Sequence, residues 1–198
     1  MDMPAAPATL ILLAVNIIVS ISALTFASGL LPRYAFNVGA LAFDKQHYRV
    51  FTSSFLHGDY LHLAFNMLTL WFFGPTVEGI LGTDGFLVVY FGAVLVSGIV
   101  SFYVNRKKPD YSSIGASDAV SGVVLSFCLF FPMTPLYIFF IPIGIPAILY
   151  GVLFMLISAN LLGRTGNRIA HEGHLGGALA GVLLTILMEP GVLTRWFG

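Results

Sequence analysis

The sequence predicts an all-α membrane protein built from six spanning helices. Of its 198 residues, 58% are hydrophobic and only 9% are charged, and its mean hydropathy is +0.91. A water-soluble domain needs a much more charged surface than this composition supplies. Apolar runs recur at about 20 residues, the length at which a helix crosses a bilayer. We therefore expect a single membrane domain over residues 1–198.

Six segments are expected to span the bilayer: 8–27, 60–81, 86–104, 117–131, 147–162 and 170–188. The first is interpreted as a retained span, because residues 1–7 lack the Lys or Arg of a signal peptide. The turn 82–85 (GTDG) separates the second span from the third, and residues 106–110 (RKKPD) predict a water-exposed loop after it. Four prolines in 131–146 favour an interfacial loop over a straight helix.

The long connection between the first two spans, residues 28–59, mixes aromatic, aliphatic and basic side chains. A loop of this length and composition is expected to pack against the helices or to lie partly embedded in the headgroup layer. The charges give no sign of a nucleic-acid partner, because nine Lys and Arg balance nine Asp and Glu. The lone Cys128 lies in an apolar stretch, which predicts that it is a packed residue of the core.

A candidate nucleophile, Ser117, follows Gly115 and Ala116 at the start of the fourth span. The N-terminal end of a helix presents unpaired N–H groups and the positive end of the dipole, which would stabilise an oxyanion. Gly115 has no side chain and lets a substrate backbone approach closely. Taken alone, the turn is more typical of a serine that only caps its helix. The histidine segment reverses that balance.

His174 lies in the sixth span beside a stripe of small residues, Gly173, Gly177 and Gly181. Such a stripe lets a neighbouring helix approach closely. The expected neighbour is the fourth span, so the Ser117 hydroxyl and the His174 imidazole would come within hydrogen-bond reach. A buried histidine bonded to a backbone carbonyl is the simpler alternative. His171, three residues earlier, is a rival base.

His62 and Asn66 are spaced i, i+4 and therefore project from one face of the second span. Polar side chains inside a spanning helix are costly and usually functional. A hydrogen bond between two helices is the structural alternative for this pair.

The order of these motifs resembles that of the rhomboid family of intramembrane serine proteases. The matching positions are Arg49, His62 to Asn66 (HLAFN), Glu78, Gly82, the Gly115–Ser117 turn, His174, Gly177 and Gly181. The resemblance implies a six-helix bundle with a Ser–His dyad, in which Ser117 attacks a peptide carbonyl and His174 removes its proton. It calls for no cofactor and no metal.

The resemblance also implies that His62, Asn66 and the Ser117 N–H complete an oxyanion hole. Arg49 and Glu78 are expected to be structural, anchoring the long loop and a helix end, and His57 has no assigned role. Substrates would be single-span membrane proteins. The chain itself would be a multi-pass protein of the bacterial inner membrane. The fifth span and residues 164–168 are candidate gate elements.

Three departures from the family pattern are visible. Asp118 stands where most relatives carry glycine, and its carboxylate would either repel the oxyanion or point away toward water or a basic partner. Ser121 stands where relatives often carry an aromatic residue that stacks on the imidazole. No third catalytic acid is evident, because Glu172 is expected on another face of its helix.

Alternatives remain open. A rhomboid-like pseudoprotease would bind membrane helices without cleaving them. A metal-dependent protease would draw on His57, His62, His171, His174 and Glu172, but the His-Glu-Gly-His spacing is three rather than the four of HExxH. A small transporter is weaker, since paired charges and duplicated halves are absent from the sequence.

Two signals conflict on orientation. Eight of the basic residues are expected in loops on one side: Arg33, Lys45, Arg49, Arg106, Lys107, Lys108, Arg164 and Arg168. The positive-inside rule would make that side cytoplasmic. The rhomboid resemblance places the same side, with the opening of the site, away from the cytosol, and we keep that orientation as the expectation.

Overall fold

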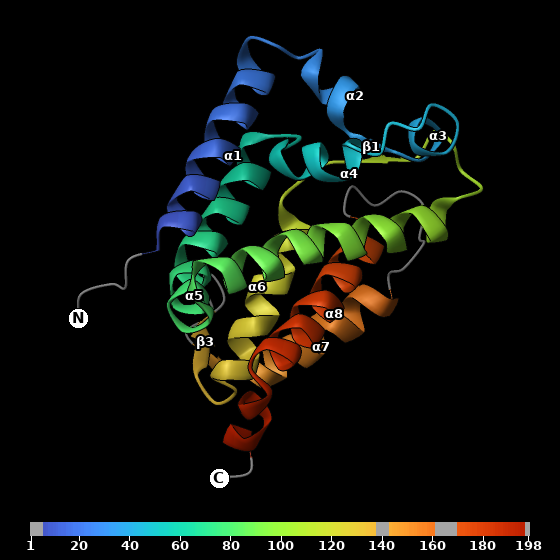
Figure 1. The fold of residues 1–198 in the computed structure, drawn as a ribbon. Helices are drawn as coiled ribbons and strands as arrows, with labels where there is room; N and C mark the ends of the chain where they lie inside the picture. Colours follow the sequence, from blue (N-terminus) through green and yellow to red (C-terminus); the bar gives the residue numbers. More distant parts are fainter. Residues whose placement is uncertain (1–5, 138–142, 161–169, 197–198) are drawn as a thin grey trace.

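The computed structural model describes residues 6–137, 143–160 and 170–196 as a bundle of long helices, with the short helices between the first two of them gathered at one end (Figure 1). The long helices are α1 (Pro7–Thr25), α5 (Tyr60–Asn105), α6 (Ser117–Phe130), α7 (Ala147–Asn160) and α8 (His171–Met188). The short elements are α2 (Leu30–Tyr34), β1 (Phe36–Asn37), α3 (Val38–Ala42), α4 (Arg49–Thr52), the 3₁₀ helices η1 (Ser53–Phe55) and η2 (Pro190–Trp196), and the strands β2 (Ser112–Ser113), β3 (Pro135–Tyr137) and β4 (Gly144–Pro146).

The predicted helical segments are found, and the predicted turn between the second and third segments falls at the break in α5. The second and third segments belong to one element, α5, which is broken at Gly82 (φ 72°, ψ 167°). This positive φ is open to glycine and strained for other residues, and the two halves of α5 run in different directions (Figure 1). With α2, α3 and α4 added, the described chain holds more helices than the six expected.

Only some of these helices have the length of a spanning segment. Over the ranges described, α1 and α5 are long and apolar enough to cross a membrane, while α6 and residues 147–157 of α7 are shorter apolar helices. At 1.5 Å per residue, a helix of 14 residues such as α6 is about 21 Å long, against about 30 Å of hydrocarbon.

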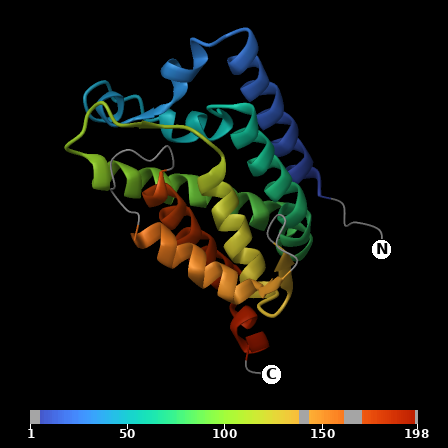
Figure 2. The same cartoon turned by 180° about the vertical axis from the view of Figure 1, so that it is seen from behind.

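α8 packs most extensively against α5 and α6 (Figure 1). The approach of α8 to α6 is close because glycines face each other: a Cβ at Gly177 would overlap the carbonyl oxygen of Asp118, and one at Gly181 would overlap that of Gly122. The predicted pairing of the fourth and sixth segments through small residues is confirmed. α7 lies outside this pair and contacts both helices less extensively (Figure 2).

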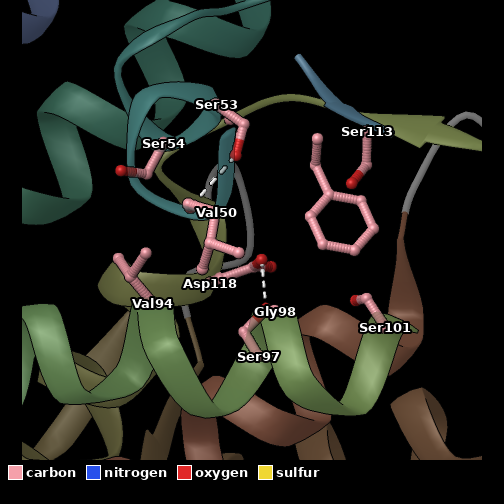
Figure 3. Close-up of a pocket in the computed structure, with 11 residues that line it drawn as sticks. Val50, Ser53, Ser54, Val94, Ser97, Gly98, Ser101, Ser113 and Asp118 are labelled. Carbon is pink, nitrogen blue, oxygen red and sulfur yellow. Dashed lines mark hydrogen bonds between the residues drawn. The ribbon is translucent and has the colours of Figure 1, made fainter. Parts of the chain in front are cut away.

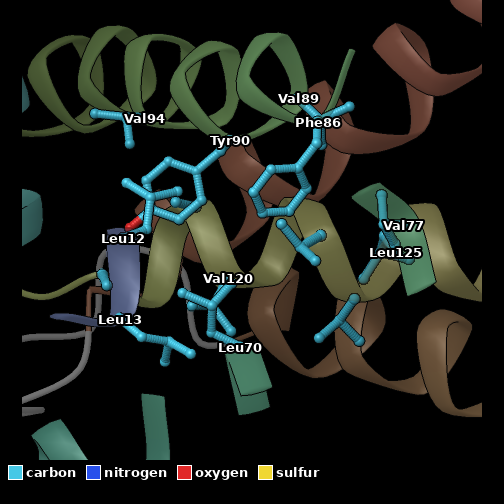
Figure 4. Close-up of a cluster of buried hydrophobic side chains, with 14 of the residues drawn as sticks. Leu12, Leu13, Leu70, Val77, Phe86, Val89, Tyr90, Val94, Val120 and Leu125 are labelled. Carbon is cyan, nitrogen blue, oxygen red and sulfur yellow. The ribbon is translucent and has the colours of Figure 1, made fainter. Parts of the chain in front are cut away.

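The main apolar core joins α1, both halves of α5 and α6, and Figure 4 shows its largest side chains. It includes Leu12, Leu13, Leu70, Val77, Phe86, Val89, Tyr90, Val94, Val120 and Leu125. Large apolar side chains are also exposed on the outer faces, for example Ile18 on α1 and Leu187 on α8. Exposure of this kind along several helices is rare in soluble monomers and suits a lipid environment.

The loop between α1 and α5 packs against the rest of the protein, as expected. Arg49 holds it together, since its guanidinium donates to the carbonyl oxygens of Pro32 (3.0 Å) and Ala35 (2.9 Å) and to the side chain of Gln46 (2.6 Å). β1 in this loop pairs antiparallel with β2 after α5.

Glu78 anchors a helix end, which confirms its expected structural role. Its buried carboxylate accepts hydrogen bonds from the N–H groups of Ala8 (2.9 Å) and Thr9 (2.8 Å) at the start of α1. The hydroxyls of Thr9 and Thr83 donate to it as well. The carboxylate thus satisfies backbone donors that the first turn of α1 leaves unpaired. The proline-rich segment after α6 is not helical where it is described, because β3 and β4 pair as antiparallel strands.

Candidate active site

Ser117 is the first residue of α6, and its hydroxyl does not cap the helix. The N-cap position is Ala116, and no side chain makes a capping hydrogen bond there. The interpretation of Ser117 as a simple N-cap is therefore wrong. The turn before Ser117 is bonded to the long loop, because the Gly115 N–H donates to the carbonyl oxygen of Ser53 (3.0 Å).

Gly115 brings His62 and Ser117 together. Its φ of 136° lies in the region that favours glycine. A Cβ at this position would lie 2.7 Å from His62 Cε1, 2.9 Å from His62 Nε2 and 3.5 Å from Ser117 Oγ. The His62 ring and the Ser117 hydroxyl therefore border the same small space, which a larger residue at 115 would fill.

Asn66 lies one helical turn after His62 and is buried. Its side-chain amide donates to the carbonyl oxygen of His62 (2.9 Å) in its own helix. The alternative of a hydrogen bond between two helices finds no support for this amide among the contacts of the described chain. An amide group has two N–H donors, so this bond leaves the second one for another partner.

His174 lies in the first turn of α8, where its ring contacts Phe154 of α7. Its imidazole interacts electrostatically with those of His171 and His62, and the His171 ring lies edge-on at 6.1 Å between centroids. No hydrogen bond joins His174 to Ser117 Oγ within residues 6–137, 143–160 and 170–196. The close contact of Asp118 with Gly173 nevertheless puts the first turns of α6 and α8 side by side. Catalytic hydrogen bonds are often long before substrate binds, and the dyad stays a prediction.

Asp118 points away from the site into a small polar cavity between α6, α5 and the long loop (Figure 3). Its carboxylate accepts a hydrogen bond from the Ser97 hydroxyl, and a Cβ at Gly173 would lie 2.6 Å from Asp118 Oδ1. The cavity is lined by the hydroxyl residues Ser53, Ser54, Ser97, Ser101 and Ser113. The carboxylate thus turns toward α5 and α8, and its hydrogen-bond partner among the described residues is the Ser97 hydroxyl rather than a basic side chain.

Glu172 lies on another face of α8, as expected. Its buried carboxylate accepts from Asn105 Nδ2 (2.7 Å) and from the Tyr111 hydroxyl (2.5 Å). Burial, together with this bond to Glu172, raises the pKa of Tyr111 above its usual range. The group ties the start of α8 to the end of α5 and to the loop after it.

His57 is a residue whose role sequence reasoning missed. It is fully buried between α1 and the Ser117 turn. The N–H of Ala116 donates to His57 Nε2 (3.4 Å), and Nδ1 lies 2.8 Å from the Ser20 hydroxyl. Because Ser20 donates its own proton to Phe55 O (3.0 Å), Nδ1 carries the ring hydrogen. The His57 ring also meets the His62 ring edge-on at 5.0 Å.

The surroundings of His57 require a neutral ring. Burial, and then the neighbouring His62, lower its pKa from 6.5 to about 3, against the smaller opposing effect of Asp59. Only the neutral ring can accept from Ala116, so His57 holds both the backbone before Ser117 and the ring of His62. Nothing local in the sequence points to Ala116, so this role has no signal in the sequence.

The Ser121 hydroxyl donates back to the carbonyl oxygen of Ser117 (2.7 Å) in its own helix. The aromatic ring that faces His174 comes from α7 instead, where Phe154 stacks on the imidazole. The gate candidates at 164–168 lie outside the residues that the structure describes.

Comparison with known proteins agrees with this arrangement. The rhomboid domain family matches residues 44–190. The chain is 34% identical over 134 residues to the mitochondrial presenilin-associated rhomboid-like protein of Rattus norvegicus, which covers 66% of this chain and 35% of that protein. It is 31% identical over 137 residues to the mitochondrial rhomboid protein 1 of Saccharomyces cerevisiae, covering 66% and 39%.

A bacterial protein is equally similar. The chain is 33% identical over 143 residues to the rhomboid protease GluP of Bacillus subtilis, covering 72% of this chain and 26% of that protein. The matched region spans about a third of the length of these relatives. Because several relatives are mitochondrial, the expected bacterial inner membrane is not supported. A family match over most of the chain, with relatives above 30% identity, shows that this chain belongs to the rhomboid family.

Proposed function

We propose that the chain is an intramembrane serine protease that cleaves the membrane segments of single-span proteins. The observation that carries the proposal is the meeting of Ser117, Gly115 and His62 at the start of α6, with the His174 turn of α8 packed beside it. A nucleophile, a base and hydrogen-bond donors are then gathered around one space that glycine keeps open.

The proposed reaction has two steps. The Ser117 hydroxyl attacks the peptide carbonyl while His174 takes its proton, and the negative oxygen of the intermediate is stabilised by the Ser117 N–H, His62 and Asn66. Collapse breaks the C–N bond, and His174 returns the proton to the leaving amine. Water then attacks the acyl-enzyme by the same route, which releases the carboxylate product and restores Ser117.

The proposal includes an integral membrane protein in which α1, the two halves of α5, α6, α7 and α8 cross the bilayer as six segments. The short length of α6 supports a site below the membrane surface, and the packed loop 28–59 would cover it. Polar residues buried in the bundle, such as Asn16 and Ser97, have protein partners and do not face lipid.

The test uses the detergent-solubilised full chain and a single-span substrate, with and without a chelator. Cleavage is expected for wild type and should fall by at least about 100-fold in Ser117→Ala and His174→Ala. A fluorophosphonate probe should label wild type and not Ser117→Ala. Loss of activity on chelation would select the metal-dependent alternative and overturn the proposal.

The pseudoprotease alternative rested on Asp118 and Ser121. Asp118 is engaged by Ser97, and a ring from α7 takes the place beside His174 that Ser121 leaves open. Substrate binding without cleavage or probe labelling would favour that alternative.

A further inference from the structure

One aromatic contact at the proposed site comes from a helix outside the α6–α8 pair. The ring of Phe154 on α7 lies 6.0 Å from the His174 ring, centroid to centroid, with an interplanar angle of 24°. This is the geometry of an offset stack, which two π systems prefer over a face-to-face sandwich. Phe154 therefore lies beside the imidazole with its ring nearly parallel to it.

A second ring extends the stack. Tyr150, one turn earlier on the same face of α7, lies 6.3 Å from Phe154 at 21°. The ring of Phe154 is thus nearly parallel both to the ring of Tyr150 and to that of His174. Tyr150 adds a contact that restrains the Phe154 ring.

Within the described part of the chain, the His174 ring has one further ring contact, with His171, and no side-chain hydrogen bond. His171 meets it edge-on, and Ser121 is turned back to the carbonyl oxygen of Ser117. α7 itself is seated on α6 through Gly151, where a Cβ would lie 3.0 Å from Leu125 Cδ1 and 3.6 Å from Cys128 Sγ. The position of Phe154 is therefore set by packing that is independent of His174.

We propose that Phe154 is a positioning residue for His174, holding the imidazole in the orientation that faces Ser117. The inference rests on the proposed protease function. When His174 takes the Ser117 proton it becomes a cation, and an aromatic face stabilises a cation at short range. The contact therefore gains strength as the reaction proceeds and acts on turnover more than on substrate binding.

The test compares Phe154→Leu, which removes the ring but keeps an apolar side chain, with Phe154→Tyr and Phe154→Trp, which keep a ring. Leu153→Ala, an exposed residue of the same helix, is the matched control. Phe154→Leu should lower kcat and the rate of fluorophosphonate labelling by about three- to tenfold with KM nearly unchanged. The two aromatic variants and the control should stay within about twofold of wild type.

The readouts separate the outcomes. Labelling by the small probe needs no movement of α7, so faster substrate cleavage with unchanged labelling in Phe154→Leu would mean that Phe154 only closes a substrate path, and the inference would be overturned. Equal rates in Phe154→Leu and wild type would overturn it as well. If Phe154→Leu fails to fold, Phe154→Met carries the same expectation. An inactive wild type would instead remove the protease proposal itself.

Discussion

At the scale of single residues, the buried polar side chains of the described chain act mainly on backbone groups. Glu78 accepts from the first N–H groups of α1, and His57 accepts from Ala116 next to the candidate nucleophile. Each bond satisfies a donor that would be costly to bury alone. These residues therefore decide where the ends of helices sit, and the candidate site depends on their protonation and shape.

The neutral state of His57 predicts acid sensitivity. Its pKa is about 3 in the folded protein and 6.5 in the reference state. Between pH 3 and 6.5 the unfolded chain binds a proton at His57 that the folded chain does not bind. The contribution of neutral His57 to the free energy of unfolding is therefore complete above pH 6.5 and is lost as the pH falls toward 3. Thermal midpoints in detergent at pH 7.5, 6 and 5 should therefore fall more steeply for wild type than for His57→Gln. Parallel pH dependences would contradict this account.

Glu78→Gln should destabilise the protein for two reasons. A neutral amide oxygen is a weaker acceptor than a carboxylate oxygen, and the amide NH₂ would face the N–H and hydroxyl donors that now bond to Glu78. The expected loss is about 1–3 kcal/mol, visible as a lower thermal midpoint. Asp84→Asn, an exposed acid near the same helix break, is the control and should change little. A midpoint for Glu78→Gln equal to that of the control would refute the anchoring role.

At the scale of elements, the contact between α6 and α8 positions the candidate site. Gly177 and Gly181 face backbone oxygens of α6 with no room for a side chain. Backbone cannot rotate away as a side chain does, so this contact fixes how the Ser117 turn and the His174 turn lie together. The same contact explains why the stripe of glycines in α8 predicts a closely packed partner helix.

Gly177→Ala should therefore separate the two helices. We expect a loss of about 1–3 kcal/mol in stability and slower probe labelling of Ser117, measured by thermal unfolding and labelling rate. Gly29→Ala is the control, since no atom lies within 4 Å of a Cβ there. Labelling and stability equal to the control would show that the helices adapt without cost.

Asp118 and Gly173 should be coupled. A Cβ at Gly173 would lie 2.6 Å from Asp118 Oδ1 and 2.9 Å from Asp118 Cγ, and both obstructing atoms belong to a side chain. Gly173→Ala should destabilise wild type and cost much less in an Asp118→Gly background, giving an interaction energy of about 1 kcal/mol or more in a double-mutant cycle. If the effects of the two substitutions on thermal unfolding were additive, the contact between Asp118 and residue 173 would not be what excludes a side chain at 173.

At the scale of the whole molecule, the loops that carry most basic residues gather at the end where α6 begins. The loop after α5 bonds to the long loop, as Gly39 N–H donates to Pro109 O (2.9 Å) and β1 pairs with β2. η2 lies at the opposite end of the bundle (Figure 1). The two loops must therefore face the same side of a membrane. The opening of the candidate site faces that side too, because α6 begins at the same end.

That shared side predicts a topology experiment. A reporter that works only outside the cytosol, inserted at residues 106–110, should be active if the rhomboid orientation holds. The same reporter placed after α8 should be inactive. Activity of a cytosol-only reporter at 106–110 would instead show that the positive-inside rule prevails.

The residues alone were enough to predict a helical rhomboid-like chain, most of its helical segments, and the residues from which a dyad would be built. Apolar length, glycine spacing and the break at Gly82 are local properties, and local properties can be read from neighbouring residues. They did not determine that Asp118 faces Ser97, that His57 supports Ala116, or that Phe154 lies beside His174. Each of these contacts joins residues on different helices, and only the packing of those helices decides which side chains meet.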